Sequence, residues 1–138
     1  MTPVLADSSF FVALFNQRER EHNSCRSAYE AIDGPLVTTE ACITEALHLL
    51  DHADAAVRSL LTNVQRGALK IPLRLGDCAS EIAYLMAKYA DTPCDFADAC
   101  IIHLADQVGV GDILTLDGDF KHYRWRRTRR FNLLIPLD

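Results

Sequence analysis

The sequence lacks paired cysteines and long apolar runs, and these absences exclude several classes of protein. Its five cysteines are an odd number and no two have CxxC spacing, which argues against a disulfide framework and a thiolate zinc site. The longest apolar run, Phe10–Phe15, is far shorter than the roughly 20 residues that cross a bilayer. No basic patch precedes the apolar residues near the N-terminus, so we expect a cytoplasmic protein without a signal peptide.

The sequence also lacks internal repeats, low-complexity tracts and Gly/Ser/Pro-rich linkers. A length of 138 residues, with 49% hydrophobic and 24% charged residues, is typical of one ordinary globular domain. We therefore expect residues 1–138 to form a single domain. All five cysteines fall in segments that we predict to be helical, where a reduced cysteine acts as a small buried hydrophobe.

Basic charge is scarce except in one short strip near the C-terminal end. The net charge is −5, yet six of the fourteen basic residues lie in residues 121–130 without an acid among them. They are Lys121, Arg124, Arg126, Arg127, Arg129 and Arg130. An acidic body with one basic strip excludes a general nucleic-acid coat and favours local binding of one phosphate backbone or of an acidic partner chain.

Short apolar strands alternate with amphipathic helices along the chain. The predicted strands are residues 4–6, 36–38, 69–71, 112–116 and 131–137, and the predicted helices are residues 10–15, 23–32, 40–52, 54–65, 77–89 and 93–108. This order predicts a three-layer α/β/α sandwich around a mostly parallel sheet of about five strands. In such sheets ligands bind beyond the carboxyl ends of the strands.

Two acids directly follow predicted strands, at the edge where chemistry is expected. Asp7 follows residues 4–6, and Asp117 follows the strand that ends at Leu116. The sequence Asp117-Gly118-Asp119 has two interpretations, an ordinary Asp-Gly turn or part of a cation site that includes Thr115. Local signals do not separate them.

Further acids border the apolar faces of two predicted helices. Asp98 lies at the margin of the core stripe of residues 93–108, where a partly buried carboxylate needs hydrogen bonds, a cation or a metal. Asp95 stands third after Thr92, a capping-box spacing that explains it without catalysis. Glu45 borders the core face of residues 40–52, and on local grounds a surface role is the simpler interpretation. His48 and His52 are interpreted as a solvated pair.

Four blocks of the sequence together resemble the PIN domain, and more narrowly the VapC-type ribonuclease toxins of toxin–antitoxin pairs. The blocks span nearly the whole chain and read VLADSS, TEALHLL, CDFADACII and LTLDGDF, starting at Val4, Thr44, Cys94 and Leu114. The resemblance implies a Mg²⁺- or Mn²⁺-dependent endoribonuclease with one or two ions. It also implies a homodimer held inactive by an antitoxin.

The resemblance carries four acidic positions over to this sequence. Asp7 and Asp98 are the main expected metal ligands. Glu45 is expected to be a ligand or to orient the attacking water, and Asp117 to complete the metal shell. Asp119 is the alternative to Asp117 for this last acidic position, and Asp95 is a further candidate ligand. Carboxylate oxygens select hard divalent ions over zinc.

The basic strip has two interpretations that the sequence leaves open. Lys121, Arg124, Arg126 and Arg127 are expected to hold RNA phosphates, with Tyr123, Trp125 and Phe131 stacking on unpaired bases. A solvated segment or an antitoxin-docking surface fits equally.

Two other functions are alternatives to the ribonuclease. The alternative is a non-catalytic RNA- or protein-binding module on a PIN-like fold, which would bind RNA without metal and without Asp98. A phosphoryl-accepting receiver domain is disfavoured, because Asp7 lacks an acidic neighbour and neither Lys70 nor Lys121 occupies the lysine position that class requires.

Overall fold

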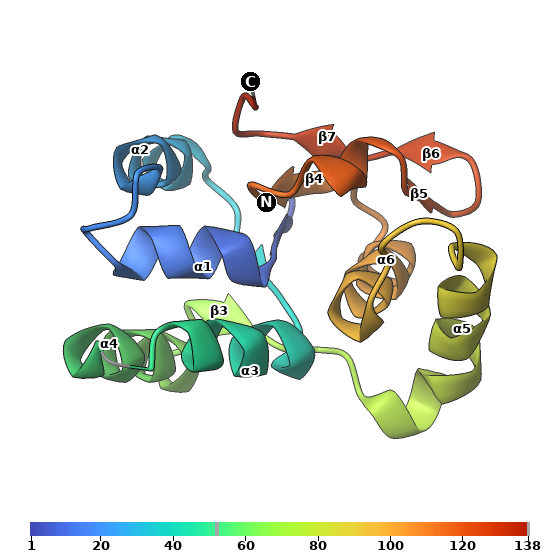
Figure 1. Ribbon diagram of the computed structural model, residues 1–138, viewed down its shortest axis with the longest axis horizontal. Helices are drawn as coiled ribbons and strands as arrows, with labels where there is room; N and C mark the ends of the chain where they lie inside the picture. Colours follow the sequence, from blue (N-terminus) through green and yellow to red (C-terminus); the bar gives the residue numbers. More distant parts are fainter. Residues whose placement is uncertain (52, 138) are drawn as a thin grey trace.

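A five-stranded parallel sheet with the order β3-β2-β1-β4-β7 forms the centre of the computed structural model, which describes residues 1–51 and 53–137 (Figure 1). Its strands are β1 (Val4–Ala6), β2 (Leu36–Val37), β3 (Leu69–Lys70), β4 (Asp112–Leu114) and β7 (Asn132–Leu133). Each neighbouring pair is parallel. The predicted α/β class and parallel sheet are therefore confirmed.

Helices cover both faces of this sheet. They are α1 (Ser8–Phe15), α2 (His22–Ala31), α3 (Glu40–Leu49), α4 (Asp54–Gln65), α5 (Leu75–Lys88) and α6 (Phe96–Val108). In the view of Figure 1, α1 to α4 lie to the left and α5 and α6 to the right. No helix in the described part of the chain combines the length and the apolar character needed to span a membrane.

Successive strand residues point to opposite faces, and this alternation divides the core into two clusters. Leu5 and Ile113 pack with α5 and α6, whereas Ala6 and Leu114 pack against α1, α3 and α4. All four side chains are 0% exposed. A central parallel strand is buried on both faces, which explains why the strands are continuous apolar runs without polar alternation.

The predicted element boundaries were wrong in three places that bear on the site. Helix α6 begins at Phe96, not at residue 93, so Cys94 precedes a helix and the other four cysteines lie within helices. Strand β4 ends at Leu114, and the last strand contains only residues 132–133. Of the predicted His48–His52 pair, His52 lies outside the described residues and His48 is exposed.

A small hairpin, which no pattern in the sequence predicted, carries the arginines of the basic strip. Strands β5 (Arg124–Trp125) and β6 (Arg129–Arg130) pair antiparallel outside the main sheet. Its turn places Arg126 at φ 43° and Arg127 at φ 70°, a left-handed conformation that normally selects Gly, Asn or Asp. Each such residue costs on the order of 1–3 kcal/mol, so the turn retains two strained arginines.

Gly111, the residue directly before β4, lies so close to the hairpin that a larger side chain there would clash with Trp125. A Cβ atom at Gly111 would lie 2.2 Å from Nε1 of Trp125, whose indole is buried and donates to the carbonyl of Arg130. We expect Gly111→Ala to lower the free energy of unfolding by about 1–3 kcal/mol, the usual effect of overpacking. Urea denaturation measures this change.

Gly76 supplies the matched control for that substitution. It lies in the first turn of α5, and a Cβ atom there meets nothing within 4 Å. Gly76→Ala should leave stability unchanged or raise it slightly, because alanine is the better helix former. Equal stabilities of the two variants would contradict the proposed clash.

Candidate active site

The sheet order places a ligand-binding edge between β1 and β4. The chain proceeds from β1 toward β2 on one side, and from β4 toward β7 on the other. Such a switch point leaves a crevice beyond the carboxyl ends of the two central strands. Asp7 follows β1, and residues 115–117 follow β4. The acids that the sequence placed after strands therefore meet at this crevice.

Asp7 is buried and is held by hydroxyl groups. It is 5% exposed. Thr115 Oγ1 donates to its Oδ2 at 2.5 Å, and Ser9 Oγ donates to its Oδ1 at 2.7 Å. The same hydroxyls accept from the next turn of chain, from the Leu116 and Asp117 amides at 2.9 Å. One hydrogen-bond network thus fixes Asp7 to the end of β4.

The same carboxylate caps helix α1. Oδ1 of Asp7 accepts from the amide of Phe10 at 3.2 Å. Burial raises the pKa of Asp7 from 3.8 to about 6, and the charge of Asp117 adds to the rise, although the hydrogen bonds from Thr115, Ser9 and Phe10 oppose it. A side chain held this firmly, with an elevated pKa, is poised to gain from a cation.

Asp98 reaches the crevice from the first turn of α6. Asp95 caps this helix by accepting the Asp98 amide at 2.9 Å, so Asp95 has the helix-start role but Thr92 does not cap. Asp98 Oδ2 lies 3.2 Å from the hydroxyl of Tyr123, which is also 2.9 Å from the carbonyl of Pro93. Burial, followed by the charges of Asp95 and Asp117, raises the pKa of Asp98 to about 7.

Asp117 is the acid that links the two others. Burial is the main cause that raises its pKa, and its charge in turn raises the pKa of both Asp7 and Asp98. Its Oδ1 accepts the amide of Asp119 at 2.9 Å and so caps the short 3₁₀ helix η1 (Gly118–Lys121). The turn and the acidic cluster, which the sequence left as alternatives, therefore coexist in one residue.

Glu45 lies beside this group on helix α3. It is half-buried, and its Oε1 accepts a hydrogen bond from the hydroxyl of Ser8, the residue after Asp7. Helix α3 packs against both α1 and α6, the two helices that begin beside Asp7 and Asp98. Glu45 thus borders the acidic crevice next to Asp7, through the hydroxyl of Ser8.

The donor set of the crevice fits a hard divalent ion in its chemistry. Asp7, Asp98 and Asp117 offer only carboxylate oxygens, the ligands that Mg²⁺ and Mn²⁺ prefer, and the charge of Asp117 opposes ionisation of the other two. In the described part of the chain no group of three His, Cys, Asp or Glu side chains stands ready to hold a metal directly. The fit therefore concerns the type of donor atom, the carboxylate oxygen, and not a preformed cage.

The predicted aromatic stacking surface was wrong. Tyr123 is 0% exposed, and Trp125 and Phe131 are each 7% exposed. Tyr123 packs edge-on against Phe120 and Tyr89 with ring centroids 5.1 Å apart in both pairs. These rings belong to the hydrophobic core that also contains the buried side chains of α6. A strip of alternating arginines and aromatic residues does not reveal which side chains turn inward.

The basic side chains of the strip separate in space. Arg126 turns back onto α6, where its amide donates to Oδ1 of Asp106 and its guanidinium lies 5.6 Å from the Trp125 ring. Lys121 is exposed on η1. Arg124 and Arg127 both line a cavity between the hairpin, α5 and α6. Of the four residues predicted to bind RNA, Arg124 and Arg127 thus line one cavity, and their role in RNA binding stays a prediction.

Sequence reasoning missed several side chains that hold the acids in place. The hydroxyls of Ser8 and Ser9 donate to Glu45 and Asp7 respectively. Tyr123 was assigned to RNA, yet its hydroxyl meets Asp98. A threonine directly after a central strand was the one available signal, and it marks Thr115 correctly.

The sequence matches a known protein family over most of its length. The PIN domain family model matches residues 4–126, a span that includes every acid of the crevice. The chain belongs to the PIN domain family. No curated protein matches the chain in a sequence search.

A solved structure supports the same fold for this PIN domain. The crystal structure of VapC20 of Mycobacterium tuberculosis, described as a toxin that cleaves the sarcin–ricin loop, matches with a TM-score of 0.79 and 19% sequence identity. The match covers 91% of this chain and 98% of that chain. The likeness extends over nearly the whole of both molecules and confirms the PIN-type arrangement of helices around the sheet.

Proposed function

We propose that this PIN domain is a divalent-metal-dependent endoribonuclease that hydrolyses RNA phosphodiester bonds. The observation that carries the proposal is the meeting of Asp7, Asp98 and Asp117 at the switch point, where each feels the charge of another. Membership of the PIN family and the fold shared with an RNA-cleaving toxin support it.

One or two Mg²⁺ or Mn²⁺ ions, when bound, would lower the pKa of an attacking water and neutralise charge that develops on the phosphate. Asp7 and Asp98 would hold the ion, and Asp117 would complete its surroundings directly or through water. Thr115 and Ser9 keep Asp7 in one orientation, so little reorganisation accompanies binding.

Glu45 is well placed to orient the water that attacks the phosphodiester bond. Its carboxylate borders the crevice from α3 and is fixed through the hydroxyl of Ser8. It would bind the ion or orient the water that attacks phosphorus as the P–O bond to the leaving nucleotide breaks. No histidine or lysine base is required by this scheme, because the acids supply both binding and orientation.

The proposal is tested by titrating RNA cleavage with metal. The purified chain should cleave single-stranded RNA in Mg²⁺ or Mn²⁺ and lose this activity in EDTA. Metal-independent RNA binding without any cleavage would support the non-catalytic binding module in its place.

The choice between Asp117 and Asp119 gives a separate prediction. Asp117 contributes to the pKa shifts of both Asp7 and Asp98, whereas Asp119 acts on Asp117. We expect Asp117→Asn to slow RNA cleavage by about 10- to 100-fold, the usual effect of disturbing a metal site's surroundings, and Asp119→Asn to change it only slightly.

An asparagine at either position retains the side-chain acceptor, and at residue 117 this preserves the cap of η1. Single-turnover cleavage rates measured at one Mg²⁺ concentration make the comparison. A larger loss with Asp119→Asn than with Asp117→Asn would reverse the assignment.

We further propose that the chain acts as the toxin of a toxin–antitoxin pair, as a cytoplasmic homodimer inhibited by its antitoxin. Its fold is that of a toxin, VapC20. Expression in a bacterial host should arrest growth, and Asp98→Asn should relieve the arrest. Growth arrest that persists in this variant would argue against an RNase toxin.

A further inference from the structure

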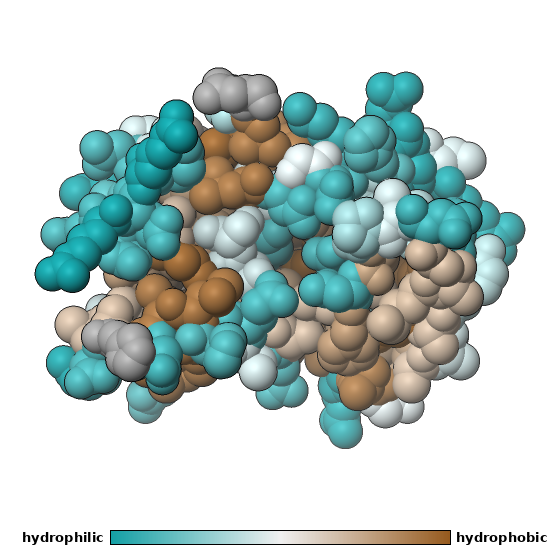
Figure 2. Space-filling view, in the orientation of Figure 1, coloured by the Kyte–Doolittle hydropathy of each residue, from teal (hydrophilic) through white to brown (hydrophobic). Residues whose placement is uncertain are grey.

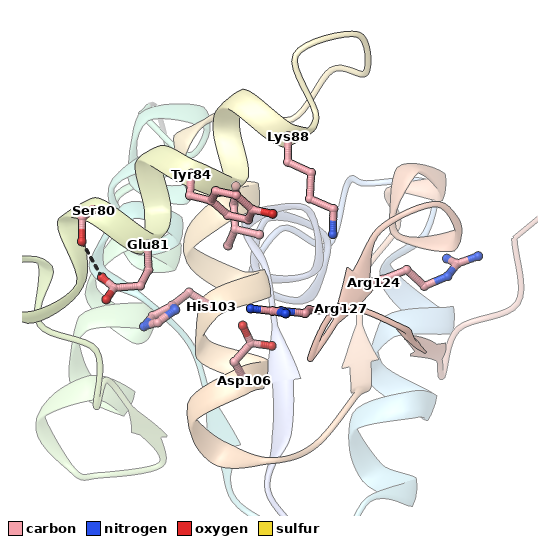
Figure 3. Close-up of a pocket in the computed structure, with 9 residues that line it drawn as sticks. Ser80, Glu81, Tyr84, Lys88, His103, Asp106, Arg124 and Arg127 are labelled. Carbon is pink, nitrogen blue, oxygen red and sulfur yellow. Dashed lines mark hydrogen bonds between the residues drawn. The ribbon is translucent and has the colours of Figure 1, made fainter.

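A cavity outside the acidic crevice contains the most unusual grouping of side chains on the molecule. It has a volume of about 340 Å³ and lies between α5, α6 and the β5–β6 hairpin (Figure 3). Lys88 and Arg127 supply positive charge, Glu81 and Asp106 supply carboxylates, and Tyr84 supplies an aromatic ring. Cations, carboxylates and a ring in one small cavity match the parts of a nucleotide.

Figure 3 shows how these groups are arranged. Arg127 reaches from the hairpin toward His103 and Asp106 on α6, and Lys88 extends toward the hairpin from α5. Tyr84 lies on the α5 side above Arg127, and 65% of its surface is exposed. A large aromatic side chain left this open beside two cations is well placed for stacking on a base.

Two aromatic rings connect this cavity to the acidic crevice. Lys88 Nζ lies 5.3 Å from the centroid of the Tyr89 ring, and that ring packs 5.1 Å from the ring of Tyr123. The hydroxyl of Tyr123 in turn meets Asp98. Tyr123 is fully buried, so these contacts join the cavity to the crevice through the interior of the domain and not along its surface.

Backbone strain gives an independent reason to expect a function here. Arg127 has φ 70°, beside Arg126 at φ 43°, where Gly or Asn would relieve the strain. The Arg126 amide is held by Asp106, which fixes the turn. Strain that persists at a residue lining a cavity is commonly associated with a site that uses that side chain.

We propose that this cavity binds one unpaired nucleotide of the RNA. Tyr84 stacks on the base, Glu81 or Asp106 accepts from its amino group, and Lys88 with Arg127 holds the adjoining phosphate. The exposed ring of Tyr84 favours a nucleotide over the rival occupant, an acidic peptide, because a base offers it a face to stack on. The assignment rests on the proposed ribonuclease function and identifies unpaired RNA as its substrate.

Binding is tested on the full chain in EDTA, with a fluorescein-labelled single-stranded RNA dodecamer of mixed sequence as the probe. Fluorescence polarisation should give a Kd raised about fivefold or more by Tyr84→Ala, the usual loss on removing a stacking ring. Arg127→Gln should weaken binding and reduce the slope of log K against log salt by about 0.7, the contribution of one phosphate contact.

The matched control is Arg58→Gln, which removes an exposed arginine on α4 and should leave the Kd unchanged. Arg127→Gly separates function from folding, because it should raise the thermal midpoint by relieving strain while still weakening RNA binding. A Kd unchanged by Tyr84→Ala or Arg127→Gln overturns the proposal. Binding of an oligoglutamate peptide as tight as that of RNA also overturns it, by assigning the cavity to an acidic protein segment.

EDTA prevents cleavage, so RNA binding is measured apart from catalysis. The nuclease hypothesis and the nucleotide-subsite hypothesis can therefore be contradicted independently. A chain that cleaves RNA in Mg²⁺ but binds it equally well after both substitutions remains a nuclease without this subsite. A chain that needs Tyr84 and Arg127 for RNA binding but never cleaves in Mg²⁺ or Mn²⁺ retains the subsite and loses the nuclease assignment.

Discussion

Replacing Asp7 or Asp98 by asparagine should slow RNA cleavage by roughly a thousandfold or more while the fold is retained. A catalytic metal supplies several kcal/mol of transition-state stabilisation, and each 1.36 kcal/mol corresponds to about a tenfold change in rate. Asparagine at position 7 keeps one side-chain oxygen, which still accepts from the Phe10 amide and retains the cap of α1, and at position 98 it still accepts from Tyr123. Cleavage rates in Mg²⁺ and circular dichroism of each variant measure the two effects.

Asp33→Asn is the control for that loss. Asp33 is exposed in the loop between α2 and β2, so its replacement removes the same charge far from the crevice. It should cleave RNA at the rate of the unaltered chain. Asp7→Asn or Asp98→Asn cleaving at that same rate would rule out both acids as the metal-binding pair.

Without metal, the two acids should make the protein less stable as pH rises. In the unfolded chain their carboxyls titrate near 3.8, whereas in the folded chain the pKa of Asp7 is about 6 and that of Asp98 about 7. The unfolded state therefore releases its protons first, and the stability these groups contribute is lost between about pH 4 and pH 7. For Asp7 alone the loss is roughly 3 kcal/mol.

Divalent metal should reverse this trend, because it binds the ionised carboxylates. The increase in thermal midpoint caused by Mg²⁺ should be large at pH 8 and small at pH 5, where protons compete. In EDTA at pH 8, Asp98→Asn should melt at a higher temperature than the unaltered chain, since it removes a buried charge, and it should respond little to Mg²⁺.

Scanning calorimetry at the two pH values, with and without Mg²⁺, measures these shifts. Asp33→Asn again serves as the control and should respond to Mg²⁺ as the unaltered chain does. A Mg²⁺ effect of equal size at pH 5 and pH 8 would contradict binding by carboxylates of raised pKa. So would an undiminished effect in Asp98→Asn.

Local sequence was sufficient for the layers of the fold. The apolar runs at residues 4–6 and 69–71 predicted strands, and the amphipathic pattern of residues 54–65 predicted helix α4 with its observed bounds. These features depend on neighbouring residues only, because side-chain period and helix stop signals act over a few positions. The acids at Asp7 and Asp117 were recognisable for the same reason, since each directly follows an apolar strand.

Tertiary structure alone decided which residues meet. The network from Thr115 to Asp7 joins positions 108 residues apart, and the contact from Tyr123 to Asp98 joins positions 25 apart. The inward turn of Tyr123 and Trp125, the separation of the arginines and the strained turn at Arg127 all follow from how the hairpin packs on α6. No local period encodes such packing, because it depends on the surface that the rest of the chain presents.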